Sequence, residues 1–185
     1  MLLSAWPAVT RARPAARLSI LGAGSALDEM RRRAEAERLV GVEFGGFVSD
    51  AAKVDAMRRA RVLVQPSRKE GWGLTVLEAN ACGTPVVATD VPGLRDAVRS
   101  GETGMLATSG DPVALADRVL EVLGDDGLRD RLAAGALAWS SRFTWDRVAA
   151  AMADMLRAAA RRAALPDDPD LFGPLPEAAA GRVRA

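Results

Sequence analysis

The segment from residue 61 to residue 89 constrains the fold of this chain more than any other. Two short apolar stretches, at 61–65 and 85–89, enclose a loop with two glycines and a helix-forming run at 74–81. A strand, a glycine-bearing loop, a helix and a second strand in this order are typical of a parallel crossover. The loop and the helix N-terminus of such a crossover can bind a phosphate.

Two carboxylates lie inside this crossover. Glu70 is on the loop and Glu78 is in the helix, among small residues. Glycines let a ligand approach the backbone closely, and carboxylates accept hydrogen bonds from hydroxyl groups. A site that holds a polyhydroxy ligand beside a diphosphate needs both features. Alternatively, Glu78 lies on a solvated helix face without a ligand. The residues at 77, 79 and 81 are apolar or small, which makes this alternative less favourable.

Size and composition narrow the class of protein. The 185 residues, 49% hydrophobic and 26% charged, suit one soluble domain, with or without a tail. A net charge of +1 gives no general attraction to nucleic acid. The chain has no histidine and one cysteine, Cys82, which excludes histidine-based triads, the usual zinc sites and an internal disulfide. No apolar run reaches the roughly 20 residues needed to cross a bilayer, and no secretory signal is evident, so a cytoplasmic location is expected.

Strand and helix patterns alternate along the chain. Strands are expected at 18–21, 42–44, 62–64, 86–88 and 105–106, with helices between them. Asp50 is expected to cap a helix at 51–60, Asp111-Pro112 to open a second helix, Asp125 or Asp126 a third, and Trp145 a fourth that ends near Arg161. The alternation predicts an α/β fold: a doubly wound parallel sheet with helices on both faces, followed by C-terminal helices. The domain is expected to span residues 1–161, and residues 162–185 to form a disordered tail.

The first residues depart from this scheme. Leu2, Leu3, Trp6 and Val9 form an apolar stripe on a helix that no strand precedes. A doubly wound domain normally opens with a strand. We therefore expect a domain truncated at its N-terminus, whose exposed stripe promotes association.

A second glycine loop offers a different function. Gly22-Ala23-Gly24 follows a strand, as in a dinucleotide-binding fold, and Glu43 lies at the distance expected for a ribose-binding acid. The third glycine of that fingerprint would fall at Leu27. A domain that binds NAD or S-adenosylmethionine therefore remains an alternative, and a tight turn without a ligand role is another.

The run from Pro66 to Pro85 resembles the Glu-x7-Glu signature of retaining GT-B glycosyltransferases, in group 1 and family 4. It reads Pro-Ser…Glu-Gly-Trp-Gly-Leu…Leu-Glu-Ala…Cys-Gly-Thr-Pro. The resemblance covers about residues 1–157. It implies the C-terminal, Rossmann-like half of a GT-B fold, which binds a UDP-, GDP- or ADP-sugar. It also implies an enzyme that transfers a hexosyl group with retention of configuration, without metal or cofactor.

The resemblance also implies roles for single residues. Glu70 would be the catalytic-site carboxylate that touches hydroxyls of the donor sugar, and Glu78 would hydrogen-bond the ribose. The backbone at Phe47 and Val48 would border the base, although a turn with a buried phenylalanine is an equal alternative there. The further donor-binding positions are Gly71, Trp72, Gly73, Leu74, Thr75 and Gly22.

Three departures from the family pattern limit these roles. The family's basic Gly-Arg…Lys-Gly loop is missing, and nothing indicates that Arg68 and Lys69 replace it. In the segment 90–96, Pro92 and Asp96 replace a glycine and a glutamate of the family pattern.

The triplet at 168–170, Asp-Pro-Asp, is interpreted as solvated acid in a proline-rich tail, so no metal site is expected.

Two hypotheses about the whole protein follow. The chain could be a fragment of a glycosyltransferase that lacks its N-terminal acceptor domain and is inactive alone. It could instead be a binding subunit that pairs with a partner chain carrying the acceptor site. The partners expected are a nucleotide sugar and the missing domain or chain, with peripheral membrane association of the full enzyme and no nucleic acid.

Overall fold

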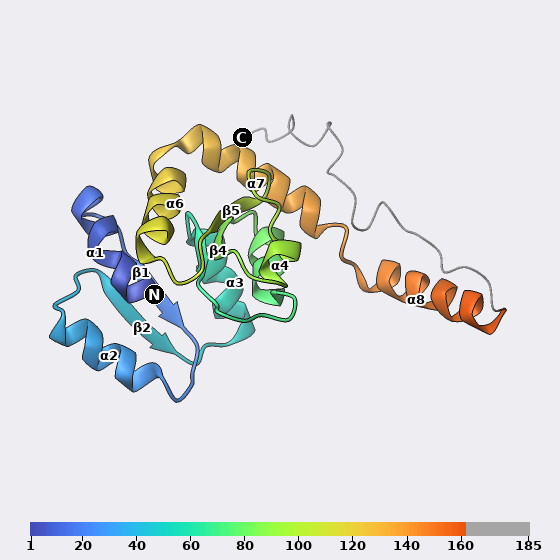
Figure 1. Ribbon diagram of the computed structural model, residues 1–185, viewed down its shortest axis with the longest axis horizontal. Helices are drawn as coiled ribbons and strands as arrows, with labels where there is room; N and C mark the ends of the chain where they lie inside the picture. The colour runs from blue at the N-terminus through green and yellow to red at the C-terminus, as the bar shows by residue number, and fades with distance from the viewer. Residues whose placement is uncertain (162–185) are drawn as a thin grey trace.

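A computed structural model describes residues 1–161 of the chain, and the elements in this range alternate between helices and strands (Figure 1). The strands are β1 Leu18–Leu21, β2 Val42–Gly46, β3 Leu63–Gln65, β4 Val86–Thr89 and β5 Gly104–Ala107. The first five helices are α1 Leu2–Ala12, α2 Leu27–Ala36, α3 Asp50–Arg59, α4 Leu74–Ala81 and α5 Leu94–Ala97. The last three are α6 Pro112–Gly124, α7 Asp126–Ser140 and α8 Trp145–Ala160. The predicted tail and its Asp-Pro-Asp triplet lie outside the described residues.

All strand pairs are parallel, as the alternation of strands and helices predicts. β1 pairs with β2 from Leu18 opposite Val42, and β3, β4 and β5 form a second sheet in that order. A helix follows each of the five strands, and the helices after the first four strands lead to the next strand. The predicted α/β class is therefore confirmed, with its hydrogen-bonded strands divided over a two-stranded and a three-stranded group.

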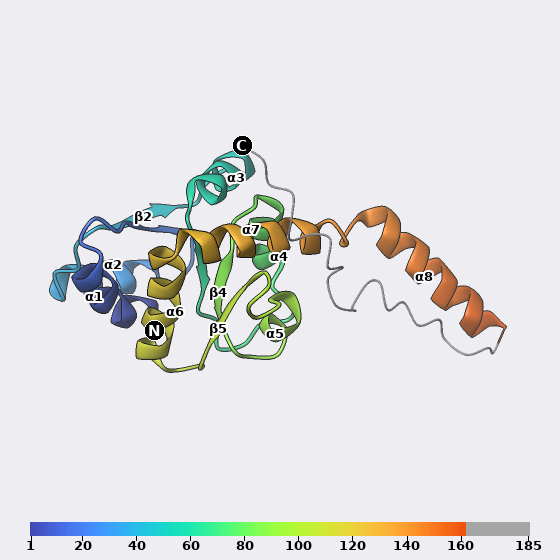
Figure 2. The ribbon, with the colours of Figure 1, turned by 90° about the horizontal axis from the view of Figure 1, so that it is seen from above.

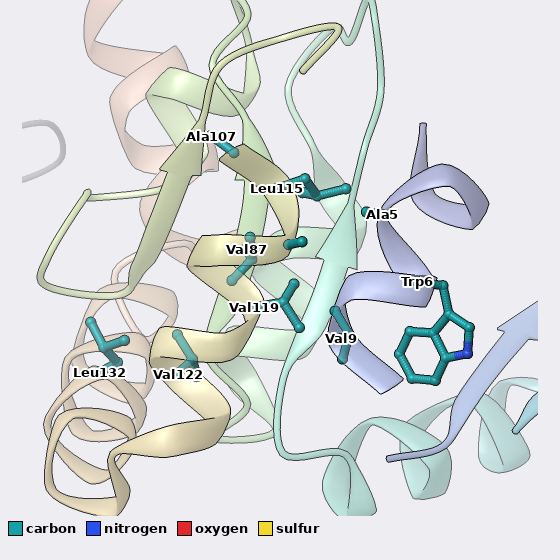
Figure 3. Packing of buried hydrophobic residues seen from close by; sticks show 10 residues of the cluster. Ala5, Trp6, Val9, Val87, Ala107, Leu115, Val119, Val122 and Leu132 are labelled. Carbon is teal, nitrogen blue, oxygen red and sulfur yellow. The ribbon is translucent and has the colours of Figure 1, made fainter. Parts of the chain in front are cut away.

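The core lies on both faces of β4, whose four residues are all buried. Val87 points to one face, where it joins buried residues of α1, α6 and α7 (Figure 3). Val86 and Ala88 point to the other face, where Met57 of α3 and Val76 of α4 join them. Side chains of a strand alternate between the two faces of its sheet, so one strand serves both layers. Helices thus cover both faces, as a doubly wound arrangement requires.

The expected exposed stripe on α1 is wrong. Leu3, Trp6 and Val9 are at most 4% exposed, and α1 packs against α6. The Trp6 indole Nε1 also donates a hydrogen bond of 2.7 Å to the carbonyl oxygen of Val40. The apolar face of α6 buries the stripe, which the pattern of α1 alone could not reveal. The expectation that this stripe promotes association therefore loses its basis.

Helix starts follow the sequence signals with one exception. Asp111 and Asp125 cap α6 and α7 through their side chains, as expected. The expected cap of α3 at Asp50 is wrong, because Ser49 caps this helix and its Oγ accepts a hydrogen bond from the Ala52 N–H. Serine and aspartate are both good N-caps, so residue type alone does not place the cap at Asp50 rather than at Ser49.

The last described helix extends away from the body of the domain (Figures 1 and 2). It presents large apolar side chains to solvent, at Trp145, Val148, Met152, Met155 and Leu156. Within residues 1–161, no helix combines the length and the hydropathy that crossing a bilayer requires.

Candidate functional site

The carboxyl ends of β3 and β4 meet at one edge of the three-stranded sheet, because the two strands run parallel. The loop at 66–73 leaves β3 at this edge, and the segment at 90–93 leaves β4 beside it. Ligands of open α/β sheets bind at this edge of the strands. The hydroxyl of Thr89, the last residue of β4, donates a hydrogen bond to the Ser67 carbonyl and so ties the loop to the sheet.

Glu70 is half-buried at the centre of this loop. Its Oε2 accepts long hydrogen bonds from Gln65 Nε2, at 3.4 Å, and from Ser67 Oγ, at 3.5 Å. Its Oε1 accepts from the Gly71 N–H at 3.2 Å. These contacts hold the carboxylate at the carboxyl end of β3 and leave it further acceptor capacity. Hydroxyl groups of a ligand can use that capacity.

Helix α4 begins directly behind the loop, at Gly73. The φ angle of Gly73 is 82°, a left-handed conformation that glycine adopts without strain. Glycine has no side chain with which to cap the first turn, and no other described side chain caps it. The N–H groups of Leu74 and Thr75 therefore point out of the helix start, where they can bind a phosphate oxygen.

The side chain of Trp72 packs against the domain. Its ring meets that of Phe143 at a centroid distance of 5.7 Å, and Phe143 in turn meets Trp139 at 4.9 Å, both edge to face. Such aromatic pairs stabilise a fixed ring geometry. The side chain of Trp72 therefore anchors the loop, and its contact with a donor stays a prediction.

Glu78 forms a contact that the sequence did not predict. Its Oε1 accepts a hydrogen bond of 2.8 Å from the Lys53 Nζ, which reaches over from α3. Hydrogen bonding to Glu78, and to a smaller degree to Asp50, raises the pKa of the Lys53 ammonium. The sequence feature that could have pointed to Lys53 is the rarity of lysine in this chain: Lys53 and Lys69 are the only lysines among 25 basic residues.

The predicted residues of the other sheet lie on loops after β1 and β2. Gly22 has a φ of 125°, and a β carbon there would meet no atom within 4 Å. The Phe47 side chain is 85% exposed, so the alternative of a buried phenylalanine in this turn is wrong. Val48 is half-buried beside it. An exposed phenylalanine can contact a ligand or partner, and the roles of all three residues stay predictions.

Two surface hollows lie away from the loop at 66–73. One, of about 310 Å³, lies between α1 and the turn after α2, and the other, of about 480 Å³, lies between α2 and β2. Neither includes a residue of that loop. Across residues 1–161, no group of three acidic or cysteine side chains gathers as a metal site would require. The candidate site therefore rests on the loop and the α4 N-terminus.

The chain is similar to known proteins over most of its described length. The family model "Glycosyl transferases group 1" matches residues 1–139. A D-inositol 3-phosphate glycosyltransferase of Xylanimonas cellulosilytica is 51% identical over 108 residues, which are 58% of this chain and 26% of that protein. A phosphatidyl-myo-inositol mannosyltransferase of Mycobacterium leprae is 40% identical over 151 residues, which are 80% of this chain and 40% of that protein.

A solved structure agrees with this similarity. The Anabaena protein HepE in complex with UDP has a TM-score of 0.75 and 25% identity, over 85% of this chain and 44% of HepE. The chain thus spans about a quarter to two fifths of the lengths of the two curated relatives.

Proposed function

Because this chain belongs to the glycosyl transferases group 1 family, we propose that it is the nucleotide-sugar-binding half of a GT-B glycosyltransferase. The observation that carries the proposal is the crossover from β3 to α4. It places Glu70, the open α4 N-terminus and Glu78 in sequence along one loop and helix, inside the matched region. The UDP complex of a structural neighbour supports a nucleoside diphosphate as the ligand class.

In this proposal the donor lies along the loop with its diphosphate at the start of α4. The N–H groups of Leu74 and Thr75, together with the helix dipole, face the phosphate oxygens. Glu78 accepts hydrogen bonds from the ribose, and Glu70 accepts them from hydroxyls of the sugar. The loops at Gly22 and at Phe47-Val48 border the base and the ribose.

The reaction that fits this arrangement is transfer of a hexosyl group with retention, as in family 4. The bond between the anomeric carbon and the diphosphate oxygen breaks, and an acceptor hydroxyl oxygen bonds that carbon on the same face of the sugar. The departing diphosphate oxygen takes the proton of the acceptor hydroxyl. Negative charge grows on the leaving diphosphate, where helix N–H groups stabilise it in place of a metal. Glu70 orients the sugar during this step, and no cofactor is needed.

A second domain or a partner chain supplies the acceptor side in this proposal. We expect the chain alone to transfer no sugar, because the family's basic Gly-Arg…Lys-Gly loop is missing from it. Loss of a single preorganised hydrogen-bond donor to the reacting group can already lower the rate about 10²–10³-fold. We propose a cytoplasmic enzyme, with peripheral membrane association of the complete form. A binding subunit that pairs in trans with an acceptor chain is the alternative.

A transfer assay tests the self-sufficiency of the chain. The purified chain is incubated with a panel of nucleotide sugars and with inositol phosphates, since the names of both relatives contain inositol. We expect no transfer. Sugar transfer that disappears in Glu70→Ala would show that the chain is self-sufficient and would refute this part of the proposal.

Calorimetric titration tests the ligand class. We expect at least one of UDP, GDP and ADP to bind more tightly than NAD and S-adenosylmethionine. The dinucleotide fingerprint at Gly22 is broken at Leu27, which is the first residue of α2. Tighter binding of NAD or S-adenosylmethionine would contradict the glycosyltransferase proposal.

A further inference from the structure

We propose that Lys53 is a positioning residue for ribose recognition: its ammonium holds the Glu78 carboxylate in the orientation that accepts the ribose hydroxyls. This inference rests on the proposed function, which gives Glu78 its ligand. Lys53 lies on α3, outside the loop and helix that carry the Glu-x7-Glu run.

The contact geometry supports a positioning role. Lys53 Nζ donates to Glu78 Oε1 at 2.8 Å and lies 3.4 Å from Asp50 Oδ1, one turn earlier on its own helix. Asp50 therefore attracts the ammonium as well, while Glu78 accepts its hydrogen bond. Both members of the pair are partly exposed, Lys53 at 32% and Glu78 at 43% of the side chain, so a ligand can reach them.

The two helices are fixed relative to each other beneath this pair. Met57 of α3 packs in one buried cluster with Val76 and Ala79 of α4. The Thr84 hydroxyl, after α4, donates a hydrogen bond of 2.6 Å to the Met57 carbonyl. Because the helices are held by this packing, the spacing between Lys53 and Glu78 is set by the fold.

Glu78 gains from such a contact because its side chain is otherwise free to move. An exposed glutamate loses rotamer freedom when it binds a ligand, and that loss weakens affinity. The Lys53 contact engages Oε1 only, and Oε2 keeps its acceptor sites for a pair of ribose hydroxyls. The ammonium also offsets the negative charge of Glu78, which would otherwise repel an anionic nucleotide.

Nucleotides that lack the ribose hydroxyls distinguish this positioning role from a direct contact between Lys53 and the ligand. The chain is titrated with the nucleoside diphosphate it binds best and with the 2′,3′-dideoxy form of that nucleotide. Lys53→Met keeps the length of the side chain and removes its charge, while Lys53→Arg keeps charge and donors. Arg59→Met is the matched control, because it breaks an exposed ion pair with Asp55 on the same helix.

We expect Lys53→Met to weaken binding of the ribonucleotide about threefold to tenfold, the scale of one partly exposed charge pair and one ordered side chain. Binding of the dideoxy form should change less than about twofold, because that ligand has no hydroxyl for Glu78 to accept. Lys53→Arg should recover most of the loss, and Arg59→Met should bind both ligands like the unsubstituted chain. Circular dichroism confirms that each variant is folded.

An equal loss for both ligands would mean that Lys53 contacts the base or phosphate directly, which overturns the inference. An unchanged affinity in Lys53→Met would overturn it as well. If the unsubstituted chain binds nucleotides but does not distinguish the dideoxy form, the ribose role of Glu78 fails, and this inference fails with it while the ligand class stands. If no nucleotide binds, the proposed function itself fails.

Discussion

Gly93 lies directly against the backbone of Glu70. A β carbon at position 93 would stand 2.5 Å from the Glu70 carbonyl oxygen and 2.7 Å from that of Gly71. The φ angle of Gly93 is 83°, which other residues rarely adopt. Backbone atoms cannot move aside as the end of a flexible side chain can. The segment after β4 therefore supports the loop that presents Glu70, and only glycine permits this contact.

We predict that Gly93→Ala displaces the loop and weakens binding of a nucleotide sugar about tenfold or more, because small misplacements of binding groups are costly. The matched control is Gly101→Ala: Gly101 has a φ of 82°, and a β carbon there meets no atom within 4 Å. Both variants carry backbone strain of about 1–3 kcal/mol. Only Gly93→Ala should lose affinity in calorimetry, and equal affinities of the two variants would contradict a supporting role for Gly93.

The two glutamates are predicted to act on different parts of the donor. Glu78→Ala should weaken binding of the bare nucleoside diphosphate by roughly 1.5–3 kcal/mol, the range for a hydrogen bond to a charged group. Glu70→Ala should leave the bare nucleotide nearly unaffected and reduce only the affinity added by the sugar. Titrations of each variant with a nucleotide and its nucleotide sugar measure this difference, and equal effects on the bare nucleotide would refute the role assignments.

The sequence predicted the crossover that carries the site well because its signals are local. Helix α4 spans Leu74–Ala81 as expected, since Gly73 can adopt the left-handed conformation before its first residue. The short apolar runs on either side predicted β3 and β4 to within one residue at each end. The positions of Glu70 on the loop and Glu78 in the helix follow directly from these elements.

Contacts between distant elements could not be predicted in the same way. The stripe of α1 looked exposed because its partner, α6, lies about 100 residues later in the sequence. The Lys53–Glu78 pair joins two helices whose relative orientation depends on the buried cluster between them. Phe47 was as plausible in the core as on the surface, since residue type alone does not decide burial in a turn.

Asn80 offers a test of the packing of α4. It is fully buried, and among the described residues neither its Nδ2 nor its Oδ1 finds a hydrogen-bond partner. An unpaired buried polar group costs roughly 1–3 kcal/mol, and alanine also favours helix over asparagine. Asn80→Ala also removes some packing contacts, and this loss offsets part of the gain. The substitution should therefore raise the free energy of unfolding by about 1 kcal/mol.

Urea unfolding of Asn80→Ala and Asn80→Asp checks this prediction. The aspartate keeps the size of the side chain and adds a buried charge, so Asn80→Asp should be strongly destabilised. If Asn80→Ala is less stable than the unsubstituted chain, then the Asn80 amide forms a stabilising contact, and the prediction is wrong.

We propose that a nucleoside diphosphate binds at the loop after β3 and the start of α4. The most direct measurement is a titration of the ¹⁵N-labelled chain with UDP, GDP or ADP, followed by backbone amide chemical shifts. We predict that the largest shifts fall on Gly71 to Thr75, with further shifts near Glu78 and at Phe47 and Val48. Shifts confined to Gly22-Ala23-Gly24 and Glu43, with the amides of Gly71 to Thr75 unmoved, would contradict binding at this loop.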